Sequence, residues 1–319
     1  MGSSVRRKGQ RLQVWKGSEK ISDLRLFDLE RLVVVGPVDF STQALALLLD
    51  RGIDVSFLTT RGRLRGSLVS GQSRNVYLRL AQFDRWRDAD FRIAFGREVV
   101  RGKLTCQRRI MIRYERNHPG QLEPDAPDRI QELVDRLPEM MSAEELMGLE
   151  GAAASVYYRQ FGRMLTTVSF PGRKRRPPPD PANALLSFGY VILTNEIAGL
   201  LEAQGFDPAI GYLHGLRYGR NSLALDVIEV FRQPLIDRLT LRLLNRRQLG
   251  PDDFEGGEGG VRLLPDSLKL YLQLYEEQLR SPSEGKESPT WRRRLDEQAA
   301  ALKEMVMAGT VAPLYAWEE

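Results

Sequence analysis

The 319-residue sequence contains a single cysteine, Cys106, and only two histidines, His118 and His214. One cysteine excludes an internal disulfide framework and a zinc site built from several cysteines. It is also typical of proteins from a reducing compartment. Any metal site or acid–base site in this chain has few imidazoles available.

The sequence also lacks a segment that would direct it to a membrane. No apolar run reaches the roughly 18 residues that a helix needs to cross a bilayer. Residues 1–8 are basic, but no apolar core follows them, so they do not form a secretory signal. We therefore expect a cytoplasmic protein that does not associate with membranes.

The composition is that of a globular protein with a small basic excess. Hydrophobic residues make up 42% and charged residues 28%, which argues against a mostly disordered chain. Lys and Arg number 47 against 42 Asp and Glu, which gives a net charge of +5. This excess favours a polyanionic partner, although it is mild for the length. The length itself predicts about two domains.

The expected elements run from strands to helices. Strands are expected at 32–35 and 53–58 with a helix capped by Ser41 between them, and helical patterns begin near residue 75. This order predicts an α+β protein with separate layers rather than a doubly wound sheet. We place a small β-rich domain and its linker at 1–87, and a larger all-α catalytic domain at 88–319. Helices of that domain are expected at 91–116, at 128–137, from Ser142, at 181–204 and from Ser222.

Glu150 is a carboxylate placed among apolar residues. Ser142 and Glu145 have the spacing of a capping box, which predicts a helix starting at Ser142. At about 100° per residue, Glu150 falls in the apolar stripe of this helix, close in angle to Leu146 and Tyr157. A buried carboxylate is unfavourable unless it is paired or bound to a metal. The position therefore indicates either a metal ligand or a buried Glu–Arg ion pair.

Asp226 and Glu229 lie one helical turn apart, and Gln233 follows on the same face. Two carboxylates at this spacing repel each other unless a cation lies near them. The ordinary alternative is a solvated acidic face. The helix is apolar on most of its faces because of Leu225, Ile228 and their neighbours, so we expect the carboxylates to be buried and to need a partner.

His214 lies in a glycine-rich turn, with Gly211 before it and Gly215 and Gly219 after it. It precedes Asp226 by twelve residues, a distance that allows the histidine to fold back over the carboxylate helix. A hydrogen-bonded structural histidine is the alternative.

The helix expected at 181–204 is apolar nearly all round but carries one polar stripe. These polar side chains either form hydrogen bonds with other buried polar groups in the core or line a site that contains water. A basic run at 173–176, followed by three prolines, precedes this helix and could contact phosphate; a solvated loop or a nuclear-localisation motif would look similar. The members of the stripe are Asn183, Ser187, Tyr190 and Thr194.

These patterns together resemble a known family. The stretches Gly211–His214 and Arg220–Arg232 are similar to the core motif of CRISPR-associated protein 1, the spacer integrase and endonuclease of CRISPR adaptation. Glu150–Ala154 resembles the first metal-ligand helix of that family, and Pro179–Tyr190 resembles its central helix. The resemblance covers nearly the whole chain.

The resemblance implies a catalytic site formed by Glu150, His214, Asp226 and Glu229. By motif, Glu150, His214 and Glu229 would bind Mg²⁺ or Mn²⁺. Many members carry Asp at the position of Glu229, so either Asp226 or Glu229 could ligate the metal directly. Such a cation can stabilise the charge that develops during attack on a phosphodiester.

The resemblance also implies a reaction and partners. The 3′-hydroxyl of a captured DNA fragment, a duplex with single-stranded 3′ ends, would attack CRISPR repeat DNA in a transesterification. The protein would form a homodimer through its β-rich domain, and two such dimers would flank a dimer of CRISPR-associated protein 2 in a heterohexamer. The candidates for DNA contacts are Arg173, Lys174, Arg175, Arg176, Asn183, Tyr190, Arg217, Arg220 and Arg232.

Three other functions fit parts of the sequence. A metal-dependent, structure-specific DNA repair nuclease would use the same ligands without integration, and a DNA-binding scaffold would have neither metal nor activity. A nucleotide-binding enzyme is suggested by the β-α-β pattern at 32–58, but no Gly-x-Gly-x-x-Gly or Walker loop follows its first strand.

Overall fold

The computed structural model describes residues 2–29, 31–59, 64–68 and 75–317. Contacts divide the chain into two compact units, Met1–Arg74 and Asn75–Glu319. The division falls before α2 (Val76–Arg87), because α2 packs on α3 (Ala89–Asn117) and α10 (Trp291–Ala308). The boundary expected at residue 87 therefore lies beyond α2, whereas the contacts place α2 in the helical unit.

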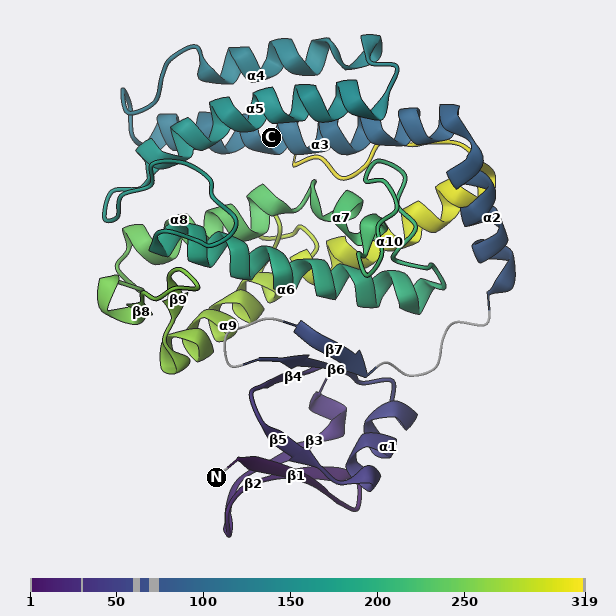
Figure 1. Cartoon of the computed structure of the whole chain (residues 1–319), viewed down its shortest axis with the longest axis vertical. Coiled ribbons are helices and arrows are strands. Elements are labelled where there is room, and N and C mark those ends of the chain that lie inside the picture. Colours follow the sequence, from purple (N-terminus) through teal and green to yellow (C-terminus); the bar gives the residue numbers. More distant parts are fainter. Residues whose placement is uncertain (1, 30, 60–63, 69–74, 318–319) are drawn as a thin grey trace. The chain divides into compact units, whose positions relative to one another are not determined.

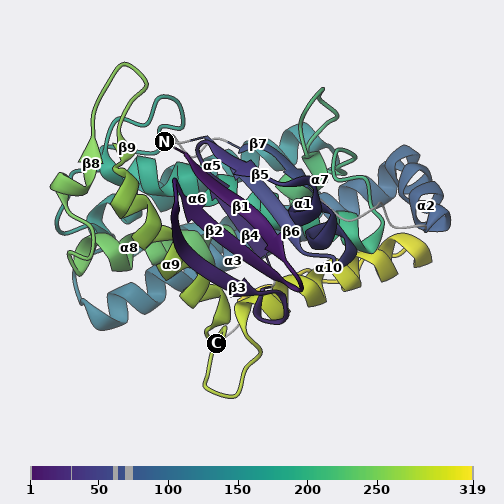
Figure 2. The ribbon, with the colours of Figure 1, turned by 90° about the horizontal axis from the view of Figure 1, so that it is seen from below.

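The N-terminal unit contains two small sheets with their own core, as the strand-rich part of an α+β protein should (Figure 2). Leu12, Leu48 and Val55 are fully buried in this core. The first sheet has the order β3-β2-β1-β5 and the second β4-β6-β7. The elements are β1 (Ser3–Lys8), β2 (Arg11–Lys16), β3 (Glu19–Arg25), η1 (Leu26–Asp28), β4 (Arg31–Val35), β5 (Val38–Phe40), α1 (Thr42–Asp50), β6 (Asp54–Leu58) and β7 (Leu64–Leu68).

The predicted β-α-β pattern is present in this unit. Strands β4 and β6 pair in parallel, and α1 connects them. The Ser41 side chain accepts a hydrogen bond from the backbone N–H of Ala44, so it caps α1 as expected. The strands predicted at 32–35 and 53–58 are confirmed to within a residue, whereas the sequence analysis did not resolve β1 to β3.

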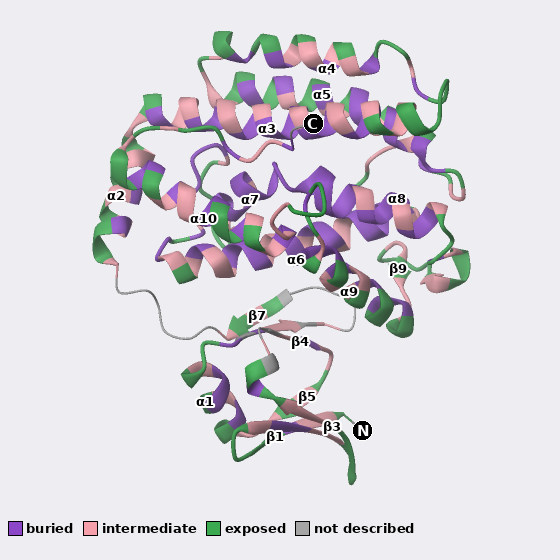
Figure 3. Cartoon of the chain, turned by 180° about the vertical axis from the view of Figure 1, so that it is seen from behind, coloured by how far each residue is buried: buried purple, intermediate pink, exposed green. Residues whose placement is uncertain are grey.

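The second unit is mostly helical (Figure 1). Its long helix α3 packs against α4 and α5 on one side and against α7 and η3 on the other. Figure 3 shows that α6, α7 and α8 are largely buried within the described residues. The remaining elements are α4 (Ala126–Asp135), η2 (Leu137–Glu139), α5 (Ala143–Met164), α6 (Pro181–Gln204), α7 (Ser222–Ile228), η3 (Arg232–Asp237), α8 (Arg238–Asn245), η4 (Pro251–Asp253), β8 (Phe254–Glu255), β9 (Arg262–Leu263) and α9 (Pro265–Arg280).

Helix α6 corrects one expectation from the sequence. By length and composition it is apolar enough to cross a membrane, although no such run was expected. Most of this stretch is buried inside the protein, and α6 packs against α7, α8 and α10. These contacts are those of a core helix.

The start of α5 is confirmed and the start of α7 is corrected. Ser142 and Glu145 form the predicted capping box. Helix α7 begins at Ser222, and Asn221 holds the N-cap position without a side-chain capping hydrogen bond. The Ser222 hydroxyl instead donates to the backbone carbonyl of Gly215, because Arg217–Asn221 folds back as a tight turn.

Candidate active site

Two carboxylates from distant parts of the chain meet at one buried lysine. Lys103 of α3 donates a hydrogen bond to Oε1 of Glu150, which lies on α5. The Lys103 Nζ also lies 2.7 Å from Oε2 of Glu229, in the turn after α7. The Lys103 and Glu229 side chains are each 5% exposed, and that of Glu150 is 25% exposed. The partner of Glu150 is therefore a lysine, not the arginine that the sequence suggested as one alternative.

Glu229 is held in its ionised form. Burial raises the pKa of this carboxyl, but Arg232 and Lys103 outweigh burial and bring the pKa to about 2. The Arg232 Nη2 lies 3.0 Å from Glu229 Oε1. His214 also lowers the pKa of Glu229, which places the imidazole within electrostatic reach of this carboxylate.

Asp226 organises the turn that carries His214. Its Oδ2 accepts the backbone N–H groups of Tyr212 (2.7 Å) and Leu213 (3.1 Å). Its Oδ1 accepts the backbone N–H of His214 (2.8 Å) and lies 2.7 Å from the His214 Nδ1. With Nδ1–H donating to Asp226, the His214 Nε2 keeps a free lone pair. The expected folding of His214 over the carboxylate helix is confirmed.

Gly211 allows this close approach. A Cβ atom at position 211 would lie 2.7 Å from the carbonyl carbon of Ser222 and 2.8 Å from Oδ2 of Asp226. Any side chain there would push the turn away from α7. The glycine before His214 is therefore a steric requirement of the site.

A polar cluster continues the site away from Glu229. The Tyr190 ring lies 4.8 Å from the guanidinium carbon of Arg232 and 5.4 Å from that of Arg173. The Tyr190 hydroxyl donates to Oδ1 of Asp237 at 2.5 Å, and the Tyr157 hydroxyl donates to Oδ2 at 2.8 Å. Burial raises the pKa of Asp237 to about 6, against the two tyrosine hydrogen bonds, which lower it. This chain of contacts holds Arg232 against Glu229.

Lys103 and Asp237 also belong to the site, and neither was predicted from the sequence. Lys103 falls on the buried stripe of α3 with Val99, Val100 and Leu104, so the periodicity of this helix could have identified it. Asp237 lies in η3, a π-helical turn, where spacing rules for an α-helix do not apply.

The predicted DNA contacts lie in different environments. Asn183 is fully buried, and its side chain accepts from Arg173 and donates to Gly172 and Asp180, so the alternative of a core-satisfying polar residue holds for it. Arg220 donates to the carbonyl of Gly215. The exposed candidates are Lys174, Arg175, Arg176 and Arg217.

The site has no ready-made group of three metal ligands in the part of the chain that the structure describes. Lys103 occupies the position between the two carboxylates, which would otherwise repel each other. Even so, no described residue gives Oε2 of Glu229 a hydrogen bond of good geometry, although the Lys103 Nζ lies 2.7 Å away. A buried carboxylate oxygen in this state is suited to a cation.

Solved structures share this fold over the entire chain. A CAS1 protein from Thermotoga maritima has a TM-score of 0.84 and 26% identity, and the match covers 100% of this chain and 99% of that one. A casposase bound to its integration product has a TM-score of 0.85 at 21% identity, which shows the shared fold. The fold is therefore that of a CRISPR-associated protein.

Sequence comparison then gives the family. The family model "CRISPR associated protein Cas1" matches residues 1–277. A CRISPR-associated endonuclease Cas1 of Rhodospirillum rubrum is 34% identical over 289 residues, covering 86% of this chain and 83% of the relative. One from Thermus thermophilus is 31% identical over 325 residues, covering 99% and 97%. The chain belongs to the Cas1 family, and the predicted resemblance is confirmed.

Proposed function

We propose that this protein is a divalent-metal-dependent DNA endonuclease and integrase of CRISPR adaptation. It joins the 3′-hydroxyl ends of captured DNA fragments to the CRISPR repeat by transesterification. The observation that carries the proposal is the meeting of Glu150 and Glu229 at Lys103, beside the helix on which Asp226 holds the His214 imidazole.

Glu150, Glu229 and His214 fit a divalent cation. Two carboxylates and one neutral imidazole are donors that Mg²⁺ and Mn²⁺ accept, and the imidazole favours Mn²⁺ in affinity. Glu229 is ionised, and His214 presents Nε2 because Nδ1 is engaged by Asp226. Bound there, the cation would stabilise charge on the phosphate and orient the attacking oxygen.

The other side chains have supporting roles. Asp226 has both oxygens occupied by the 212–214 turn, so it fixes the imidazole, and Glu229 is the better candidate for a direct ligand. Lys103 compensates the charge of Glu150 and Glu229 and must yield to the cation. Arg232 balances the remaining charge of Glu229 and lies beside the place where a phosphate would bind.

The solved structures of relatives support the proposed partners. A structure titled as a Cas6-RT-Cas1–Cas2 complex has a TM-score of 0.82 and 25% identity, and the match covers all of this chain and 35% of that one. We infer that this protein forms a homodimer through its β-rich unit, that two dimers assemble with a Cas2 dimer, and that the complex acts in the cytoplasm. Its substrates are duplex DNA with single-stranded 3′ ends and CRISPR repeat DNA.

The test uses DNA products. Purified protein, with and without its Cas2 partner, is incubated with 3′-hydroxyl duplexes and a supercoiled repeat-containing plasmid, or with branched DNA, in Mn²⁺, Mg²⁺ or EDTA. Glu150→Gln and His214→Asn should abolish metal-dependent strand joining. Glu144→Gln, on an exposed position of the same helix α5, should not change it.

Two outcomes would overturn the proposal. Cleavage without joining, even with the partner present, would favour the repair nuclease. Joining or cleavage that persists in EDTA, or in both active-site variants, would mean that these residues are not the catalytic centre.

A further inference from the structure

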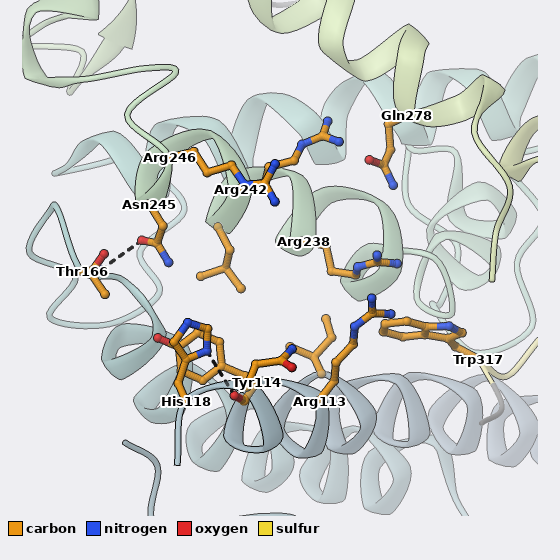
Figure 4. A pocket seen from close by; sticks show the side chains of 13 residues that line it. Arg113, Tyr114, His118, Thr166, Arg238, Arg242, Asn245, Arg246, Gln278 and Trp317 are labelled. Carbon is orange, nitrogen blue, oxygen red and sulfur yellow. Dashed lines mark hydrogen bonds between the residues drawn. The ribbon is translucent and has the colours of Figure 1, made fainter. Parts of the chain in front are cut away.

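A second charged feature lies within the helical unit, in a cavity between α3, α8 and the C-terminal segment. The cavity has a volume of about 520 Å³, which is within the range of ligand sites. Figure 4 shows arginine side chains around it, with the stacked rings of Tyr114 and His118 on its floor and Trp317 at one end. No carboxylate lines it among the described residues, and the lining includes Arg113, Arg238, Arg242 and Arg246.

These four arginines have no ion pair within the residues that the structure describes. The Nε of Arg242 is buried without a hydrogen-bond partner there. Burial, together with the nearby charges of Arg113 and Arg242, lowers the pKa of Arg238 to about 10. Arg113 and Arg246 are exposed to solvent, so the cost of holding like charges close together falls on Arg238 and Arg242, and an anion in the cavity would relieve it.

The helix dipole does not account for the whole arrangement. Arg242 and Arg246 lie at the C-terminal end of α8, where the dipole favours a cation. Arg238 is the first residue of α8, and its guanidinium carbon lies 4.6 Å from the ring centre of Trp317. Because η3 runs directly into α8, Arg238 lies within a continuous helical stretch and gains no such dipole benefit.

The spacing of the arginines indicates the shape of the anion. Arg238, Arg242 and Arg246 follow one face of α8 at intervals of four residues, so their positions repeat about every 6 Å over about 12 Å. A row of this length can contact consecutive phosphates along one chain. Tyr114 and His118 stack on each other, 4.4 Å between ring centres, and give the cavity an aromatic wall of the kind on which bases stack.

We propose that this cavity is a binding site for a chain of phosphate groups, separate from the carboxylate–histidine site, and that its ligand is the backbone of a nucleic-acid strand. Guanidinium groups bind phosphate oxygens in pairs of parallel hydrogen bonds, which suits an arginine row without carboxylate partners. A free nucleoside triphosphate offers the same chemistry from another source, and the experiment separates the two.

The experiment compares two double variants of the full-length chain. Arg242→Gln/Arg246→Gln removes two charges from the cavity. Arg116→Gln/Arg247→Gln removes two exposed charges, one near the end of α3 and one directly after Arg246, and neither residue lines the cavity. Binding of a labelled single-stranded oligothymidylate, and separately of ATP, is measured in EDTA by fluorescence anisotropy and competition over a range of salt concentrations.

We expect the cavity variant alone to lose oligonucleotide affinity, by about tenfold for each lost contact. For this variant, the slope of log K against log salt concentration should become shallower by about 1.4, because each of the two lost contacts to a single-strand phosphate contributes about 0.7. Its unfolding temperature should stay equal or rise, because like-charge repulsion is reduced. Loss of ATP affinity alone would assign the phosphate chain to a free nucleotide instead.

Other results overturn the proposal. Equal losses of oligonucleotide affinity in both double variants would mean that binding depends only on the overall positive charge. No loss of affinity in either variant would mean that the cavity does not bind phosphate. A cavity variant that is less stable, with unchanged binding, would mean that the arginines are paired within the chain itself.

Discussion

Replacing Lys103 with methionine should make the folded protein depend on a divalent cation. The substitution keeps the length of the side chain but removes the ammonium group that Glu150 and Glu229 share. Removing one partner of a buried ion pair typically costs 3–5 kcal/mol. Because Arg232 still pairs with Glu229 and Glu150 is partly exposed, we expect the lower end, about 3 kcal/mol. That corresponds to a fall of roughly 6–12 °C in unfolding temperature in EDTA.

A cation should restore the stability of this variant. Mn²⁺ at about one hundred times its dissociation constant contributes about 2.7 kcal/mol to a state that binds it, nearly the whole loss. In the wild type the cation must displace Lys103, so we expect a smaller rise in unfolding temperature and weaker Mn²⁺ binding by calorimetry. Lys269→Met is the control, because Lys269 forms an exposed ion pair with Asp266 on α9 and should change neither quantity.

Either of two results would refute this role of Lys103. If Lys103→Met were as stable as the wild type in EDTA, the lysine would not be compensating two buried carboxylates. If Mn²⁺ stabilised the variant and the wild type equally, Lys103 and the cation would not compete for one position.

Three further predictions concern the surroundings of the site. Gly211→Ala should destabilise the protein by about 1–3 kcal/mol in urea unfolding, because its Cβ would collide with the start of α7. Gly148→Ala, at a position with open space on α5, is the control and should stabilise the protein by about 0.5–1 kcal/mol; equal effects of the two substitutions would contradict the steric role of Gly211. Asp226→Asn should lower Mn²⁺ affinity 10–100-fold in calorimetry, because His214 loses its orienting carboxylate; unchanged affinity would remove that role. The Asp237 pKa of about 6, against 3.8 when unfolded, means that the unfolded chain ionises first, so stability should fall by about 3 kcal/mol in total as pH rises from about 3 to 7; Asp237→Asn should flatten that profile, and an unchanged slope would count against the assignment.

Local features of the fold could be predicted from the sequence, and long-range pairings could not. The capping box at Ser142 and the cap at Ser41 are encoded within four residues, so spacing alone located both helix starts. The apolar stripe also placed Glu150 on the face of α5 that packs toward α3, although its side chain is 25% exposed. Its partner Lys103 lies 47 positions away, and no local rule connects the two.

The same limit explains the remaining differences. The unit boundary depends on which side α2 packs, and packing is tertiary information. The strands β1 to β3 carry many charged residues, so their alternation was too weak to separate them from loops. The family resemblance located Asp226 and Glu229 together, but only the hydrogen bonds of Asp226 to the 212–214 turn distinguish the two carboxylates.

The π-helical turn η3 has a consequence for how this chain tolerates changes in length. It lies between the turn that carries Glu229 and the helix α8 that carries Arg238 and the arginines after it. A π-helical turn holds about one residue more than an α-helical turn, and each residue rotates a helix by about 100°. Deleting one residue within Arg232–Asp237 would therefore turn α8 relative to α7 by that angle. A substitution along this segment changes the contacts of one side chain. A single insertion or deletion would instead rotate the arginine row on α8 relative to Glu229 and its partners.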